Sequence, residues 1–556
     1  MASSLPEIIS PHIVTGLEGT ALNAAERDLL RAFPPAGIIL FSRNVESRKQ
    51  LSALCAEVIE IIGKASGLVP LVMADHEGGR ISVLARAIGV PPTQMTAWRA
   101  FAETGDPGLP AAVFRESARR MRSCGINMFL GPVADVNSEY LNPVIGTRAF
   151  SEDADEVAKA VAAAVRTFAE EGILTSIKHF PGHGSSLEDS HLVLPTLDRT
   201  LDELRQEDVV PFMKGIEAGA DSVMTAHVAP RGRNIPASLD PAVVRGILRE
   251  EIGFDGVIIT DGLEMSGILT GAGLVGAARD ISERDESAWT RTEERIYGGF
   301  RREWIMRLKP AVVARTALEA GNDLLLFCRP AAEVYRELDD IGRFLEGDGD
   351  FWNGAFREKY ADSLRRIEAL RRRAGIFQPP VPAEWHYPAT AGAVVEIAKD
   401  PLKLLPFGPG KVPAILFYGE EEDFARYPVT RFIDRLIELV TAGREPRVYN
   451  ARHLVAMGMA RSAVNPEWID LYSFQDRSVE NSRVLVLLFR KPLAPKDIGR
   501  ISEGFEVVIA AERPWDSFYV KDGRTAITCY GISDSTAEAV ARILVGQVAP
   551  APVKFD

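Results

Sequence analysis

Eight short runs of β-forming residues alternate with stretches of helical periodicity in the N-terminal part of the chain. The runs cover residues 12–16, 37–41, 69–74, 127–133, 174–178, 222–226, 256–260 and 323–327. Alternation with this count is typical of a (β/α)8 TIM-like barrel, in which helices surround a closed parallel sheet. A doubly wound open sheet gives the same alternation, so the count alone leaves both folds open.

Polar residues fall at the carboxyl ends of five of these runs. They are Asp75, Asp135 with Asn137, Lys178 with His179, His227 and Asp261. Each of them alone could be a helix cap or a turn residue. In a barrel, however, the carboxyl ends of all strands form one face and share one pocket. Their joint placement therefore favours the barrel and predicts a pocket on that face.

The chain has 556 residues, which exceeds one ordinary core and indicates two domains. We expect residues 1–375 to form the barrel, with a charged helix at 356–373, and the Pro-rich stretch 376–390 to be a linker. Residues 391–556 then form a smaller α/β (αβα) sandwich. Its expected strands are 412–418, 483–488, 506–511 and 526–530, with a helix at 535–544.

A charged segment at about 271–310 reads as an insertion between the seventh and eighth strands. It is either a solvated helical hairpin or a functional element, because long insertions beside active-site loops often have a role. As a functional element it would be a lid or a subunit contact, and the second of these implies a homodimer.

Composition narrows the class of protein. Hydrophobic residues make up 46% of the chain and charged residues 25%, which is ordinary for a soluble enzyme. The net charge of -13 disfavours nucleic acid and anionic membranes as partners. We find no signal peptide at the N-terminus and no membrane-spanning apolar run, so a cytoplasmic location is expected. The four cysteines are scattered without metal or redox spacing and are expected to be buried apolar thiols.

The stretch 177–191 holds three of the eight histidines and is predicted to be a catalytic loop. Asp189 stands two residues before His191, and such a pair can orient an imidazole for proton transfer near neutral pH. His179 and His183 would need a helix between them to bind one metal ion, which Pro181 and the adjacent glycine prevent. We therefore expect neither a metal site nor a cofactor.

Four ordered motifs resemble family 3 glycoside hydrolases, and within that family the two-domain form of the NagZ-type β-N-acetylglucosaminidase branch. They are Ala74-Asp-His-Glu-Gly-Gly-Arg80, Asn142-Pro-Val-Ile-Gly-Thr-Arg148, Lys178-His-Phe-Pro-Gly-His-Gly184 continuing to Asp189-Ser-His191, and Phe254-Asp-Gly-Val-Ile-Ile-Thr-Asp-Gly-Leu-Glu-Met265. The resemblance covers residues 1–375 except the insertion, and the second domain more weakly. It implies a barrel enzyme that acts on a carbohydrate.

The resemblance also implies roles for individual residues. Asp261 matches the nucleophile of a retaining mechanism with a covalent glycosyl-enzyme intermediate, His191 the acid/base and Asp189 its dyad partner. An imidazolium can protonate the leaving oxygen and, once neutral, deprotonate water.

Further residues match positions that bind the terminal sugar. They are Asp75, Arg148, Lys178 and His179. His227 is expected to line the pocket, although a hydrogen-bonded core histidine would look the same in sequence. For His183, inside a Gly-His-Gly turn, we favour a structural role.

Three positions depart from the family pattern. Val83 stands where a second sugar-binding arginine is usual, Ser185-Ser186 replaces Asp-Thr, and Gly262 replaces an Asp after the nucleophile. Arg86 is one residue that could replace the lost arginine. The proposed chemistry survives these changes, but the identity of the sugar is less constrained.

Three functions remain open from the sequence. The first is a β-N-acetylglucosaminidase that removes terminal GlcNAc, for which the resemblance suggests peptidoglycan recycling. The second is a glycoside phosphorylase using the same residues, because a histidine acid/base repels phosphate less than a carboxylate would. The third is a catalytically silent sugar-binding or regulatory protein.

Overall fold

The computed structural model describes most of the barrel and part of the C-terminal region. The described residues are 8–188, 194–233, 235–265, 268, 309–344, 360–375, 396–399, 414–418, 427–441, 448–450, 483–488, 496, 498–499, 507–512, 520, 525–529 and 531–545. Most of the predicted insertion, the linker at 376–390, and the residues Asp189 and His191 lie outside them.

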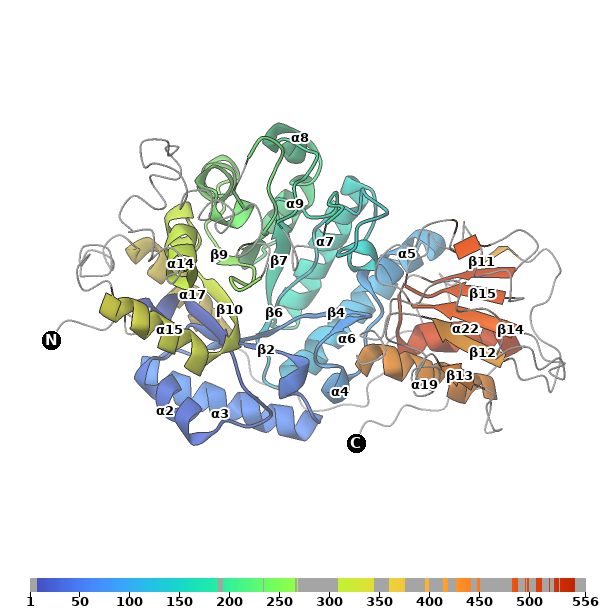
Figure 1. Cartoon of the computed structure of the whole chain (residues 1–556), viewed down its shortest axis with the longest axis horizontal. Coiled ribbons are helices and arrows are strands. Elements are labelled where there is room, and N and C mark those ends of the chain that lie inside the picture. Colours follow the sequence, from blue (N-terminus) through green and yellow to red (C-terminus); the bar gives the residue numbers. More distant parts are fainter. Residues whose placement is uncertain are drawn as a thin grey trace.

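Eight parallel strands form one sheet in the order β10-β1-β2-β3-β6-β7-β8-β9. They are β1 (Ile13–Gly16), β2 (Gly37–Leu40), β3 (Leu71–Ala74), β6 (Met128–Phe129), β7 (Leu174–Phe180), β8 (Ser222–Thr225), β9 (Val257–Thr260) and β10 (Leu325–Pro330). The two outer strands of this order also meet, because Ile259 bridges Leu324 and the amide of Thr260 donates to the Leu324 carbonyl at 3.0 Å. The sheet therefore closes into the predicted barrel (Figure 1), and the doubly wound alternative is wrong.

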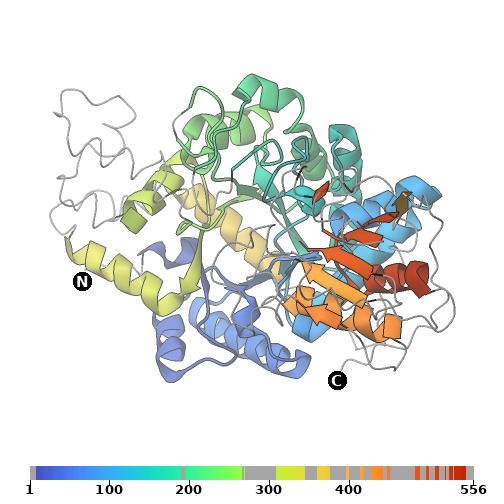
Figure 2. The same ribbon diagram turned by 45° about the vertical axis from the view of Figure 1, so that its right-hand side comes forward.

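Helices surround this barrel on the outside (Figures 1 and 2). They are α2 (Ala24–Ala32), α3 (Arg48–Ser66), α4 (Ala85–Ile88), α5 (Gln94–Thr104), α6 (Gly108–Ser123), α7 (Ala154–Glu170), α8 (Leu201–Gln206), α9 (Val210–Glu217), the π-helix η5 (Ala242–Glu251), α14 (Lys309–Ala320) and α15 (Ala331–Phe344). Polar N-cap side chains stabilise the first turns of several of these helices. Each accepts a hydrogen bond from the backbone amide three residues further along the chain; they are Ser47, Thr93, Asp153 and Thr200. These caps satisfy amides that have no partner inside the helix.

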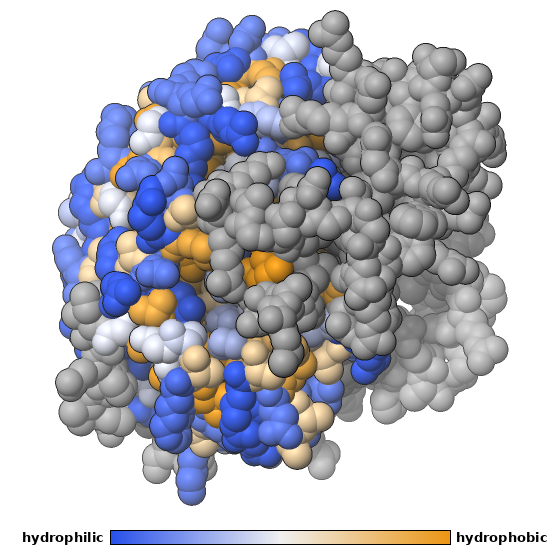
Figure 3. All heavy atoms as spheres, turned by 90° about the vertical axis from the view of Figure 1, so that its left-hand side faces the viewer, coloured by the Kyte–Doolittle hydropathy of each residue, from blue (hydrophilic) through white to orange (hydrophobic). Residues whose placement is uncertain are grey.

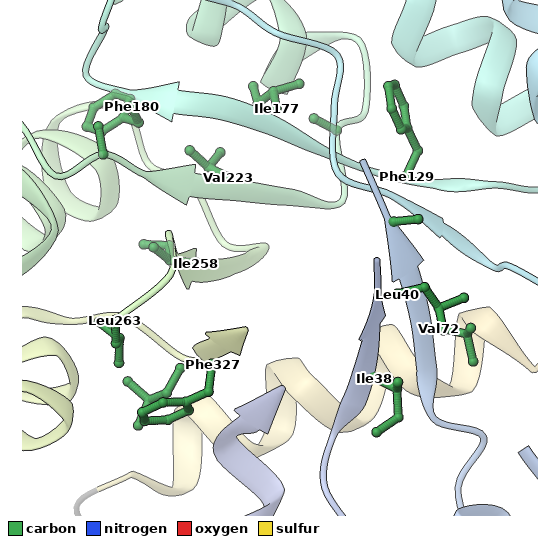
Figure 4. Close-up of a cluster of buried hydrophobic side chains, with 14 of the residues drawn as sticks. Ile38, Leu40, Val72, Phe129, Ile177, Phe180, Val223, Ile258, Leu263 and Phe327 are labelled. Carbon is green, nitrogen blue, oxygen red and sulfur yellow. The ribbon is translucent and has the colours of Figure 1, made fainter. Parts of the chain in front are cut away.

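Alternate residues of each strand pack into two different apolar layers. Ile38, Val72 and Ile258 point outward into the layer beneath the helices (Figure 4), whereas their neighbours Ile39 and Met73 belong to the layer inside the barrel. A period of two is the signature of a strand, and burial on both faces explains why these runs are continuously hydrophobic.

Helix α17 (Ala361–Ala374) covers the end of the barrel where the strands begin. Arg371 donates to the carbonyls of Val69 and Leu68, just before β3, at 3.0 and 2.7 Å. Arg366 pairs at 2.7 Å with Asp323, just before β10. Apolar residues of α17 join the layer inside the barrel. One end of the barrel is thus closed, and the carboxyl ends of the strands lie at the other.

Three elements differ from the expectation. Strand β6 has only two residues, although hydrogen bonds to the neighbouring strands continue through Leu130, Gly131 and Pro132, and Val133 bridges Lys178. Strand β7 continues past 178 to Phe180. A hairpin of β4 (His76–Gly78) and β5 (Ile81–Ser82), which the sequence did not predict, follows β3.

A second sheet lies in the C-terminal region. Its order is β11-β16-β15-β14-β12-β13, and only the β11–β16 pair is antiparallel. The strands are β11 (Glu396–Lys399), β12 (Ala414–Tyr418), β13 (Val448–Asn450), β14 (Arg483–Leu487), β15 (Val507–Ala510) and β16 (Thr525–Thr528). The helices α19 (Tyr427–Thr441) and α22 (Asp534–Val545) pack on it in a separate apolar cluster. The predicted strands and helix are confirmed, β11 and β13 were missed, and the exact domain boundaries stay predictions.

None of the helices in the described part of the chain combines the length and hydrophobicity needed to cross a bilayer. Hydrophilic side chains dominate the described surface on the side that faces left in Figure 1, with small apolar patches between them (Figure 3).

Replacing Asp323 tests the closure of the barrel. This fully buried carboxylate accepts a hydrogen bond from the amide of Ile258 on β9 at 2.8 Å and pairs with Arg249 and Arg366. Asp323→Ala leaves two partly buried guanidinium groups without their carboxylate, so we expect a loss of about 3–5 kcal/mol of unfolding free energy in urea denaturation. Asp28→Ala, which removes an exposed pair with Arg31, should leave the midpoint unchanged. Equal midpoints for both variants would contradict this account.

Candidate active site

The closed barrel brings the predicted polar residues to one end. Asp75 follows β3, Asp135 follows β6, Lys178 and His179 lie near the end of β7, and Asp261 follows β9. In a parallel barrel these positions face one pocket.

A buried carboxylate that the sequence analysis left without a role joins two of the predicted sugar-binding cations. Glu77, on the β4–β5 hairpin, lies 2.5 Å from Lys178 Nζ and accepts from Arg148 Nε and Nη2 at 2.7 and 2.9 Å. Arg148 comes from the short helix η3 (Gly146–Arg148). Lys178 Nζ also pairs with Asp75. The side chains of Glu77 and Lys178 are 1% and 2% exposed.

The charges of this cluster stabilise one another. Burial alone raises the pKa of Glu77, but Arg148 and Lys178 outweigh it and hold the pKa at about 2. Burial likewise opposes the charge of Lys178, yet Asp75 and Glu77 raise its pKa. Burial raises the pKa of Asp75, and Lys178 and Arg148 oppose that shift. Glu77, Lys178 and Arg148 are held in their charged forms, and charged groups are strong hydrogen-bond partners for sugar hydroxyls.

His179 is held as a neutral imidazole. Its Nδ1 lies 2.7 Å from Asp135 Oδ2, and its Nε2 lies 3.4 Å from Arg148 Nη2. Because an arginine can only donate, Nε2 accepts and Nδ1 carries the hydrogen. Burial, Arg148 and Lys178 lower the pKa of His179 well below its ordinary value, and nearby Asp261 raises it without reversing the shift. The low pKa keeps the His179 ring neutral, and Asp135 and Arg148 fix its orientation; its predicted contact with the sugar stays a prediction.

The turn after β9 positions Asp261. Its amide donates to the carbonyl of Thr225 on β8 at 3.0 Å, and its Oδ1 accepts from the amide of Gly262 at 2.7 Å. A Cβ on Gly262 would lie 2.9 Å from Cys328 Sγ, so the space of the usual Asp side chain is taken by the thiol. A side chain at position 262 would therefore require the thiol to move.

His227, which follows the neighbouring strand β8, holds the same turn. Its Nε2 lies 2.9 Å from the Gly262 carbonyl and its Nδ1 2.8 Å from Ser238 Oγ, and the ring is buried. A carbonyl can only accept, so Nε2 carries the hydrogen and Nδ1 accepts from the hydroxyl. Both ring nitrogens are thus engaged by protein atoms, and this geometry favours a positioning role over the predicted contact with the sugar.

Two side chains hold the Gly-His-Gly turn at residues 182–184 by hydrogen bonds to the His183 backbone. Asp135 accepts from the amide of His183 at 2.8 Å, and Asn142 donates to its carbonyl at 2.9 Å. A Cβ on Gly184 would lie 1.7 Å from the Val136 carbonyl oxygen, so only glycine fits there. These contacts fit the structural role favoured for His183.

The other predicted residues have different positions. Val83 packs partly buried against the barrel core, and Arg86 is exposed on α4. Asp189 and His191 lie outside the described residues, so their catalytic roles stay predictions. The two ends of their loop are tied together, because Glu188 Oε2 accepts from the amide of Thr196 at 3.3 Å. Within the described residues, no three acidic, His or Cys side chains form a metal-binding group.

Comparison with known proteins decides the family. The sequence model described as "Glycosyl hydrolase family 3 N terminal domain" matches residues 7–281. A "Beta-hexosaminidase" of Stenotrophomonas maltophilia (strain R551-3) is 39% identical over 259 residues, which is 46% of this chain and 75% of that protein. One of Xanthomonas oryzae pv. oryzae (strain KACC10331 / KXO85) is 36% identical over 268 residues, 48% of this chain and 78% of that protein. This chain belongs to glycosyl hydrolase family 3. The resemblance is confirmed, and with it the prediction of a glycoside hydrolase.

Solved structures extend the family likeness over the whole chain at the level of the fold. A family 3 β-N-acetylglucosaminidase from Paenibacillus sp. str. FPU-7 matches with a TM-score of 0.71 at 24% identity, covering 99% of this chain and 98% of that one. The β-glucoside phosphorylase BglX matches with a TM-score of 0.66 at 18% identity, covering 98% and 92%. Both share the fold of this family 3 chain, so fold alone does not separate hydrolysis from phosphorolysis.

Replacing Glu77 tests the charge cluster of this family 3 site. Glu77→Gln leaves Lys178 and Arg148 buried with one carboxylate fewer, so we expect a loss of about 3–5 kcal/mol of unfolding free energy at pH 7. The folded state lowers the pKa of Glu77 from 4.5 to about 2. The ionised carboxylate therefore stabilises the fold above pH 4.5, and this stabilisation is lost as the pH falls toward 2. The deficit of the variant should therefore shrink between pH 4.5 and 2 in urea denaturation. A deficit independent of pH would contradict the pairing, and Glu60→Gln on the surface is the control.

Replacing His227 tests its hold on the turn that carries Asp261, the predicted nucleophile. His227→Phe removes the donor to the Gly262 carbonyl and should lower kcat about 10- to 100-fold, since small misplacements of a reacting group are costly, while KM changes little. His227→Gln can place an amide nitrogen where Nε2 was and should recover part of kcat. Steady-state kinetics of both variants decide this; a rise in KM with unchanged kcat would instead support the predicted contact with the sugar.

Proposed function

We propose that this family 3 chain is a retaining exo-β-N-acetylglucosaminidase. The observation that carries the proposal is the placement of Asp261, after β9 and close to His179, at the barrel end that holds Asp75, Lys178 and Arg148. The names of the relatives support an N-acetylhexosamine as the terminal sugar. Peptidoglycan fragments as substrate and the cytoplasm as compartment belong to the same proposal and rest on the resemblance.

The proposed reaction has two steps. Asp261 attacks the anomeric carbon while His191, protonated and paired with Asp189, gives its proton to the leaving oxygen. Neutral His191 then takes a proton from water, whose oxygen displaces Asp261 and restores the enzyme. Lys178 and Arg148 donate to hydroxyls of the sugar and Asp75 accepts from them.

Charge balance favours water over phosphate as the acceptor. The two cations of the described site, Lys178 and Arg148, are already paired with Asp75 and Glu77. When the acceptor attacks, Asp261 is bonded to the sugar and carries no charge, so only these four groups count. Two cations already paired with two carboxylates offer a phosphate ion no excess positive charge, which weakens its binding. This supports the hydrolase over the phosphorylase.

The assay compares the wild type with Asp261→Asn on aryl β-N-acetylglucosaminide and aryl β-glucoside, with and without phosphate. We expect release from the N-acetylglucosaminide only, unaffected by phosphate, and a loss on the order of 1,000-fold or more in the variant. The first sugar product, followed by NMR, should be the β-anomer. Asp198→Asn, at an exposed carboxylate, is the control.

Each other result selects a different function. Acceleration by phosphate with formation of sugar 1-phosphate would identify a phosphorylase. A folded wild type that binds sugar and releases nothing from either substrate would identify a sugar-binding protein.

A further inference from the structure

The second sheet contacts the hairpin that carries Glu77 through a buried ion pair. Arg80, between β4 and β5, lies with its Nε 2.9 Å from Glu512 Oε2, and the two side chains are 6% and 8% exposed. Its Nη2 also donates to the Leu488 carbonyl at 2.5 Å. Leu488 and Glu512 come just after β14 and β15, so this contact is made by the carboxyl ends of strands in the second sheet.

A second contact lies beside the first. Gly531, shortly after β16, has a positive φ of 122°, and a Cβ there would lie 2.2 Å from Thr93 Cγ2. The same methyl group would be 2.6 Å from a Cβ on Gly79 of the hairpin. Thr93 caps helix α5. The second sheet therefore packs tightly on both the hairpin and the start of α5.

Both contacted segments hold Arg148. Glu77 of the hairpin binds its guanidinium with two hydrogen bonds, and Gln94, the residue after Thr93, donates to its carbonyl. Gln94 also accepts from the amide of Val133 at 3.1 Å, which ties the start of α5 to the strand region after β6.

The hairpin cannot hold its own position. It pairs at His76 with Ser82 and at Gly78 with Ile81, and two strands of this length are not stable by themselves. Its place depends on what it packs against, and a buried arginine without its carboxylate would move toward water.

We propose that the second sheet helps to form the sugar site by fixing Arg148. The Glu512–Arg80 pair holds the hairpin that carries Glu77, and the contact of Gly531 with Thr93 holds Gln94. Glu512 and Arg80 are thus positioning residues that act on Arg148 through other side chains. The inference rests on the proposed function, since it assigns Arg148 to the sugar. No residue of the second sheet needs to touch the substrate in this arrangement.

Kinetics of the full-length chain test the proposal. Glu512→Gln should raise KM for the aryl N-acetylglucosaminide about 10-fold with kcat within about 3-fold, because binding is weakened while the nucleophile is untouched. Glu512→Asp keeps the carboxylate and should lie nearer the wild type. Gly531→Ala, which forces Thr93 aside, should raise KM independently.

The matched control is Glu538→Gln. Glu538 pairs with Arg435 at 3.0 Å between α22 and α19, the two helices that pack on the second sheet. It should leave KM unchanged. Equal KM effects of Glu538→Gln and Glu512→Gln, or an unchanged KM in folded Glu512→Gln and Gly531→Ala, would overturn the proposal.

Hydrogen exchange gives a readout that does not need activity. Amides of residues 76–82 and 146–148 should exchange faster in Glu512→Gln than in the wild type or Glu538→Gln. If the wild type hydrolyses no substrate yet these amides respond, the proposed function fails while the coupling stands. If exchange is unchanged, the coupling fails whatever the activity.

Discussion

The carboxylate of Glu77 is the interaction on which the site depends. It joins Lys178 from β7 and Arg148 from η3 to a hairpin that follows β3, so three segments distant in sequence meet at one buried charge. Without this carboxylate the buried cations Lys178 and Arg148 would repel each other, and less would compensate for the hydration that each loses on burial. Arg148 in turn lies against His179, whose ring Asp135 orients. This cluster therefore orients the side chains that are predicted to bind the sugar.

The sequence predicted the barrel and most of its site for physical reasons that act locally. Runs such as 37–41 and 256–260 are continuously hydrophobic, as expected of a strand that is buried on both faces. Polar residues after those runs, such as Asp75 and Asp261, had to share one end once the sheet closed.

The rest depends on contacts between distant residues, which no local pattern records. Glu77 belongs to the family motif at residues 74–80, but its partners lie on β7 and η3, far away in the sequence. His227 gave the same signal whether it faced the sugar or the Gly262 carbonyl, and only the fold distinguishes the two. The sequence showed Gly262 as a departure from the family pattern, but not that Cys328, on β10, lies where a side chain at this position would begin. Strand β13 was missed because its three residues are too few to show a period of two.

The departures from the family pattern bear on how the sugar is held more than on the chemistry. The Val83 side chain packs against the core and can donate no hydrogen bond to a sugar. The bond from its amide to the Asp75 carbonyl, at 3.2 Å, is one that any residue at this position could make. The predicted donors that remain, Lys178 and Arg148, are both paired with Glu77. A site with fewer donors needs each of them placed more firmly, because a misplaced donor leaves a buried hydroxyl without its hydrogen bond. The second sheet, which presses on the segments that hold Arg148, supplies such placement from outside the barrel.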